Sequence, residues 1–270
     1  PACATSATER KAMDQLLDGY RRFREQTWPR ECRRFESLSR HGQHPRAMVI
    51  TCSDSRVDPQ MIFGAAPGEL FVVRNVGSFV PPFDASHGYH GTCAAIEFAV
   101  LHLDVRDIVV CGHSHCGAIR ALYADPHPEA VHMREWLELG RDAVMPVQAT
   151  EEALRRTEQR SIVLQLERLM GYPMVASRVR KGQIYLHGWH YLIEEGRVDV
   201  LDVESGRFMP AGAARGRDDA LDEFDACRRY ASQSARLLGR GSCVQDQSSC
   251  SRSRMTAARK RAASPPVMQR

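Results

Sequence analysis

The chain has 270 residues, of which 43% are hydrophobic, and its formal net charge at pH 7 is +4. This length permits one large α/β domain or two small ones, and the small charge speaks against a nucleic-acid partner. No apolar run approaches the roughly 18 residues of a membrane span, and no signal-like stretch stands at the start, so we expect a cytoplasmic protein without a membrane partner. Nine scattered cysteines, without the spacing of a disulfide framework, also favour a reducing compartment.

The first predicted element is an amphipathic helix within residues 8–26. Apolar side chains recur there at spacings of three and four from Met13 to Phe23, which places them on one helical face. A second helix is expected near 31–41. We therefore predict an N-terminal helical arm at about 8–41, whose apolar face needs a partner surface.

Three apolar runs that follow have the character of buried strands: residues 46–52, 69–75 and 107–113. A predicted helix at 91–103 lies between the last two, and this alternation of strand, helix and strand implies parallel strands. The first and third runs end in Cys52 and His113. Because ligands bind at the carboxyl ends of parallel strands, these two side chains are expected to meet there.

The later elements complete an α/β fold class, with a mostly parallel central sheet flanked by helices. Helices are expected at 115–123, 131–139 and 149–170, followed from residue 183 by a strand, a hairpin around Glu195 and Gly196, and a last strand. We assign residues 1–211 to a single catalytic domain.

The remaining residues, 212–270, are rich in Arg, Ser and Ala, and we interpret them as a largely disordered tail. One stretch at 218–239 could form a short helix. The basic end could contact RNA or an acidic partner by charge alone, but a solvated appendage is the favoured interpretation.

Cys52, His113 and Cys116 together offer two thiolates and an imidazole to one metal ion. Zinc prefers a tetrahedral shell of such ligands, and a site with three protein ligands keeps its fourth position for water. Asp54 and Arg56 add a carboxylate and a guanidinium beside that position. A closed structural zinc site, with Asp54 as the fourth ligand, is the competing interpretation.

These segments resemble the β-class carbonic anhydrases. The resemblance rests on CSDSR at 52–56 and HSHCG at 113–117, and extends through the segments at 71–83, 91–103, 108–119 and 188–202, over about residues 10–210. It implies one Zn²⁺ per chain and a lyase that catalyses reversible hydration of carbon dioxide to bicarbonate and a proton, by attack of zinc-bound hydroxide.

The resemblance also implies roles for single residues. Asp54 would accept a hydrogen bond from the hydroxide, and Arg56 would keep Asp54 ionised and oriented. Val49 stands where family members with a closed site have Trp, which favours a permanently open site. In the implied substrate pocket, Gln43 supplies a hydrogen-bonding amide. An apolar wall is formed by Phe71, Val76 and Phe98, and Gly117 is a small residue near the metal.

The family further implies a homodimer or a dimer-based oligomer, with Gln43 and Phe71 serving the neighbouring chain. No histidine is assigned as proton shuttle. His187 and His190 lie three residues apart in a predicted strand, so their side chains point to opposite faces and a shared second metal is not expected.

Two other functions remain open. A related enzyme could hydrolyse carbon disulfide or carbonyl sulfide at the same zinc, and the motifs do not separate these substrates. A regulatory protein with a purely structural metal is the other alternative, although it has no need of the Asp54 and Arg56 pair. Inhibition by small anions such as azide, which compete at an open zinc, would distinguish an enzyme from such a protein.

Overall fold

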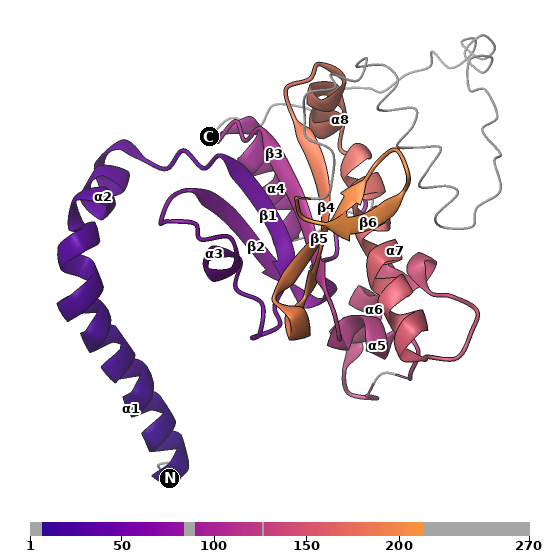
Figure 1. The fold of residues 1–270 in the computed structure, drawn as a ribbon, viewed down its shortest axis with the longest axis horizontal. Coiled ribbons are helices and arrows are strands. Elements are labelled where there is room, and N and C mark those ends of the chain that lie inside the picture. Colours follow the sequence, from indigo (N-terminus) through magenta and orange to yellow (C-terminus); the bar gives the residue numbers. More distant parts are fainter. Residues whose placement is uncertain (1–6, 84–89, 126, 213–270) are drawn as a thin grey trace, which may run out of the picture.

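The structure is a computed structural model that describes residues 7–83, 90–125 and 127–212 (Figure 1). Within these residues the strands form one six-stranded sheet in the order β2-β1-β3-β4-β5-β6. Strands β1 to β4 are parallel, while β5 and β6 are antiparallel. The predicted fold class, with its mostly parallel sheet, is confirmed. The bounds of the strands are β1 Ala47–Cys52, β2 Leu70–Asn75, β3 Asp107–His113, β4 Tyr185–Leu192, β5 Arg197–Asp202 and β6 Arg207–Pro210.

Most of the helices also lie where the sequence predicts them. Their bounds are α1 Ala7–Arg22, α2 Trp28–His41, α3 Pro59–Ile62, α4 Gly91–Leu101, α5 Gly117–Ala121, α6 Val131–Leu137, α7 Glu151–Met170 and α8 Pro173–Arg180. Helices α3 and α8 and strand β6 were not predicted. Strand β6 and helix α3 have only four residues each, too few to show a periodic pattern. The predicted tail and its helix at 218–239 lie outside the described residues.

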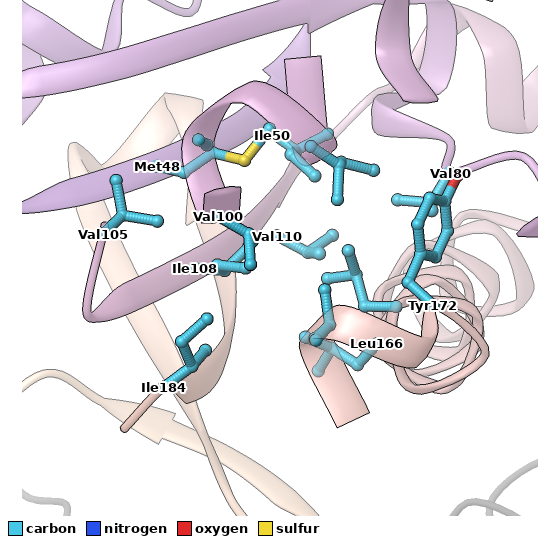
Figure 2. Close-up of a cluster of buried hydrophobic side chains, with 14 of the residues drawn as sticks. Met48, Ile50, Val80, Val100, Val105, Ile108, Val110, Leu166, Tyr172 and Ile184 are labelled. Atoms are coloured by element: carbon cyan, nitrogen blue, oxygen red, sulfur yellow. The ribbon is translucent and has the colours of Figure 1, made fainter. Parts of the chain in front are cut away.

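The main core lies between one face of the sheet and helices α4, α7 and α8 (Figure 2). Alternate residues of β1 and β3 point to this face, because successive strand residues project to opposite sides. Met48, Ile50, Ile108 and Val110 are completely buried there. They pack with Val100 of α4, Leu166 of α7 and Tyr172, which precedes α8.

Two glycines let α7 approach the sheet closely. A Cβ atom at Gly112 of β3 would lie 2.9 Å from Ile162 Cδ1, and one at Gly188 of β4 would lie 3.0 Å from Ile162 Cγ2 and Leu166 Cδ1. Such distances are tighter than nearly all real Cβ contacts, so a side chain at either position would force Ile162 or Leu166 to shift. The close approach brings the polar residues in the first half of α7 near the ends of β3 and β4.

The opposite face of the sheet carries a smaller cluster. Val49, Val109 and Cys111 are buried there, and the ring of Phe63 lies 4.9 Å from that of Trp189. In the part of the chain that the structure describes, no helix is both long and apolar enough to cross a membrane.

The arm, formed by α1 and α2, extends away from the sheet (Figure 1). A turn of π-helix at Phe23–Thr27 joins its two helices. The apolar side of α1 is exposed, with relative accessibilities of 68% for Leu16 and 59% for Tyr20. The predicted amphipathic helix therefore exists, but this chain does not bury its apolar face.

Candidate metal centre

The three predicted ligands meet at the carboxyl ends of β1 and β3. Cys52 is the last residue of β1, His113 is the last of β3, and Cys116 immediately precedes α5. The parallel register places Thr51 beside Cys111, so the two strands end next to each other. The ligand atoms of the three residues all lie within 4.8 Å of one another, and all three residues are buried. This group could hold a metal ion.

The hydrogen bonding of His113 fits a metal ligand. Its Nδ1 lies 2.8 Å from the carbonyl oxygen of Ser114, to which an Nδ1–H donates. That tautomer leaves a lone pair on Nε2, which is buried and has no hydrogen-bond partner within the described residues. A buried polar atom without a partner is rare in proteins, and here it faces two thiols. Two sulfurs and one imidazole nitrogen are the donor set that zinc prefers.

The sulfur atoms of Cys52 and Cys116 lie within 4.8 Å of each other, so the charge state of one affects the other. The hydrogen bond from Cys116 lowers the pKa of Cys52 to about 4, against the opposing effect of burial; His113 and the backbone N–H groups of Gly77 and Asp54 contribute in the same direction. The same hydrogen bond raises the pKa of Cys116. The lowered pKa favours the thiolate form of Cys52, which is the form that binds metals.

Asp54 and Arg56 form a two-pronged ion pair at the mouth of the cluster. Arg56 donates from Nε to Oδ1 at 2.9 Å and from Nη2 to Oδ2 at 2.7 Å, and its backbone N–H donates to Oδ1 at 3.0 Å. These bonds hold the pKa of the Asp54 carboxyl well below its usual range. Asp54 Oδ2 lies 3.9 Å from His113 Nε2. Both carboxylate oxygens thus engage Arg56, and Asp54 is not part of the three-residue ligand group.

Arg74, which was not predicted as a site residue, fixes the backbone around the cluster together with Arg56. Arg74 donates from Nε to the Cys52 carbonyl at 3.1 Å and from Nη2 to the Asp54 carbonyl at 2.7 Å. Arg56 Nη2 also donates to the carbonyl of His115, which has the unusual φ of 54°. A charged residue inside the apolar run at 69–75 was the available signal for Arg74.

The predicted substrate residues divide into two groups. Val76 follows β2, whose last residue pairs with Cys52, and Gly117 is the first residue of α5. These two lie beside the cluster.

The second group lies toward the other end of the sheet. Gln43 precedes β1, and with about 3.3 Å per strand residue it is separated from Cys52 by roughly the whole strand length. Phe71 pairs with Met48 near the start of β1, and its ring lies 5.9 Å from that of Phe98. The fold therefore does not bring these three residues to the cluster of their own chain.

The two histidines of β4 have separate partners. His187 Nε2 lies 2.8 Å from Asp107 Oδ1, whereas His190 Nε2 lies 3.1 Å from Glu158 Oε2. The predicted opposite orientations are confirmed. Of the histidines near the motifs, His115 lies 3.7 Å from Glu194, and His87 falls outside the described residues.

The chain thus combines an α/β fold with a buried Cys-His-Cys group, a candidate metal centre, at the carboxyl edge of its parallel strands. The sequence profile of the family described as "Carbonic anhydrase" matches residues 47–198. A carbonic anhydrase of Synechocystis is 38% identical over 226 residues, covering 79% of this chain and 78% of the relative. One from Pseudomonas aeruginosa is 39% identical, covering 73% of this chain and 91% of the relative.

Solved structures agree with these relatives. The β-carbonic anhydrase CcaA is 39% identical and superposes with a TM-score of 0.70, over 74% of this chain and 99% of that chain. One of two tetrameric β-carbonic anhydrases from Sordaria macrospora is 28% identical with a TM-score of 0.63, over 71% and 97% of the two chains. The chain therefore belongs to the β-class carbonic anhydrases, which are lyases, as the resemblance in its sequence indicated.

Proposed function

We propose that the protein catalyses the zinc-dependent, reversible hydration of carbon dioxide to bicarbonate and a proton. The observation that carries the proposal is the buried group of two thiols and a partnerless imidazole nitrogen, with the Asp54 and Arg56 pair at its mouth. Membership of the family supports the reaction.

Cys52, His113 and Cys116 would hold one Zn²⁺ per chain. The ion would act as a Lewis acid that lowers the pKa of bound water to about 7 and so provides a nucleophile without a strong base. The protein supplies the ligand geometry, and the Ser114 carbonyl fixes the tautomer of His113 that can bind.

Asp54 would accept a hydrogen bond from the attacking oxygen and so direct a lone pair toward carbon dioxide. Its pairing with Arg56 keeps the carboxylate ionised and limits its rotation, since three N–H groups contact its two oxygens. We propose that this pairing keeps the site open, because a carboxylate held by Arg56 does not occupy the fourth ligand position.

The substrate pocket is proposed to use residues from two chains. Val76 and Gly117 would line it from the chain that supplies the ligands. Gln43, Phe71 and Phe98 would line the pocket of the neighbouring chain, because they lie toward the opposite end of the sheet from their own ligands. This arrangement requires a homodimer or a dimer-based oligomer, built through the exposed apolar face of the arm.

The domain limits and the compartment remain predictions. We retain residues 1–211 as one catalytic domain, since the sheet and its helices run from the arm to β6 without a second sheet in the described chain. The cytoplasm stays the expected location because the described cysteines are free thiols, as in a reducing compartment.

The test is the initial rate of carbon dioxide hydration, measured by stopped flow on zinc-replete protein at mildly alkaline pH. Asp54→Asn should lower kcat/KM by about 10²-fold or more, because one amide oxygen cannot both pair with Arg56 and direct the nucleophile. Zinc content should remain at one per chain.

Asp58→Asn is the matched control for this experiment. Asp58 is an exposed aspartate four residues away that caps α3, and asparagine caps helices equally well. Its rate should equal that of the wild type. Zinc-replete wild-type protein that does not hydrate carbon dioxide and is insensitive to azide would refute the proposal.

A further inference from the structure

A second carboxylate lies beside Cys116. Glu158 of α7 is 4% exposed, and its Oε1 accepts the backbone N–H of Cys116 at 3.1 Å. Its Oε2 lies 3.1 Å from Nε2 of His190, which is completely buried. The proposed mechanism uses neither residue.

The hydrogen bonds define how this pair is arranged. A carboxylate only accepts hydrogen bonds, so the imidazole of His190 donates from Nε2. Nδ1 of His190 is buried and has no partner within the described residues, which suits an unprotonated nitrogen better than an N–H. Both oxygens of Glu158 are thus engaged, one by the N–H of Cys116 and the other by Nε2 of His190.

Burying the carboxylate of Glu158 costs free energy, which an apolar side chain of similar size would not. Glu158 stands between Leu154 and Ile162 at spacings of four on α7, and both of these neighbours are buried and apolar. An apolar side chain at this position would avoid the penalty of burying a charge. A carboxylate here instead fixes the backbone at one metal ligand, which no apolar side chain can do.

Glu158 contacts the backbone of the same residue, Cys116, whose sulfur is a candidate metal ligand. The segment around Cys116 runs through His115, with its left-handed φ, into α5, where the backbone N–H of Arg120 donates to the Cys116 carbonyl at 3.0 Å. Anchoring the N–H of Cys116 therefore fixes both the start of α5 and the position of the thiolate. Partners of this kind orient metal ligands from behind.

We propose that the Glu158 carboxylate, itself oriented by His190, is a positioning residue that holds Cys116 in its metal-binding geometry. The inference rests on the proposed function, because it assumes that the cluster binds zinc. The two carboxylates then have different roles at one centre. Asp54 orients the nucleophile, whereas Glu158 orients the metal ligand Cys116.

The experiment measures the zinc dissociation constant by competition with a chromogenic chelator, on the full chain. Glu158→Ala should weaken zinc binding by about 10 to 100-fold, the usual effect of removing a residue that orients a ligand. Glu158→Gln should weaken it less than Glu158→Ala, because an amide oxygen can still accept the Cys116 N–H but carries no charge.

Thr157→Ala is the matched control. Thr157 is completely buried on the same helix, but it bonds to the Tyr123 hydroxyl and the Ala153 carbonyl rather than to the metal loop. It should lose stability while keeping wild-type zinc affinity. The thiolate-to-metal absorption band of the Co²⁺-loaded protein should change in both Glu158 variants and stay constant in Thr157→Ala.

The outcomes separate this inference from the proposed function. Wild-type zinc affinity in Glu158→Ala, with loss of stability alone, would show that Glu158 is merely structural. If Glu158→Ala does not fold, Glu158→Gln decides: weaker zinc binding supports the proposal and unchanged binding overturns it. A wild-type chain that binds no zinc would instead overturn the proposed function, and this inference with it.

Discussion

The arm and the body of the protein differ in how far their apolar side chains are buried. The body is formed by the sheet with α3 to α8. In the body, Met48, Ile50 and Ile108 are completely buried by elements of the same chain. In the arm, Met13, Leu16 and Tyr20 of α1 are more than half exposed. The body thus contains its own core and all three candidate ligands, whereas the arm has an apolar face that only another surface can cover. Zinc binding should therefore belong to one region and assembly to the other.

The largest expected effect tests the body alone. Cys52→Ala removes one of three ligands, so zinc content should fall from one per chain to nearly none and carbon dioxide hydration should drop to background. Zinc content by mass spectrometry of the native protein measures this directly. Cys111→Ala is the control, because Cys111 is buried in β3 outside the cluster and should leave zinc bound. Zinc retained in Cys52→Ala would mean that the ligand assignment is wrong.

The next effect tests the arm alone. Leu16→Glu places a charge on the exposed apolar face of α1, so dimer dissociation should become easier by about 10²-fold, from the loss of roughly 2 to 3 kcal/mol of leucine burial. Sedimentation velocity over a concentration series measures the change.

Gln15→Glu adds the same side chain next to Leu16, away from the apolar face, and should leave assembly intact. Under the proposed exchange of Gln43 and Phe71 between chains, the Leu16→Glu monomer should keep its zinc and lose most of its turnover. A fully active monomer would show that each chain builds a complete site by itself.

The smallest effect concerns the surface of the body. The Ser114 hydroxyl donates to Glu194 at 2.6 Å, and this bond lowers the pKa of Glu194. The pKa of Glu194 is therefore lower in the folded protein than in the unfolded chain, where it is about 4.3. The bond stabilises the folded state above that unfolded pKa, and this stabilisation is lost as the pH falls through the folded pKa. The side chain of Glu194 is 45% exposed, so the contribution should stay below about 1 kcal/mol.

Urea unfolding of Glu194→Gln against wild type, at neutral pH and again in acid, measures this contribution. The difference in unfolding free energy should be present at neutral pH and vanish in acid, while exposed Glu97→Gln shows none at either. A difference that persists in acid would assign the effect to packing rather than to charge.

Much of the body could be predicted because its signals are local. The strands ending in Cys52 and His113 are mostly apolar, as is typical of parallel strands covered on both faces. Helices α4 and α7 have 11 and 20 residues, long enough to be recognised as helices. Strand β6 and helix α3 lacked that length.

The centre itself could be predicted only in part. Its ligands are soft donors at strand ends, which sequence shows, but hydrogen bonds between distant elements leave no local pattern. Arg74 and Glu158 both act on backbone groups, and any residue type can supply a backbone carbonyl or N–H. A charge in an apolar strand and a charge on the apolar side of α7 were the only signs of them.

The strand order has a further consequence for how the chain acquires its centre. The chain enters the sheet at β1, adds β2 on one side, and then crosses back to lay β3 and β4 on the other. The ligands stand at the switch point between these two directions, where open α/β sheets bind their ligands. Cys52 belongs to the half built first, and His113 and Cys116 to the half built second. Neither half alone carries all three donors, so a metal ion bound there would need both halves of the sheet in place.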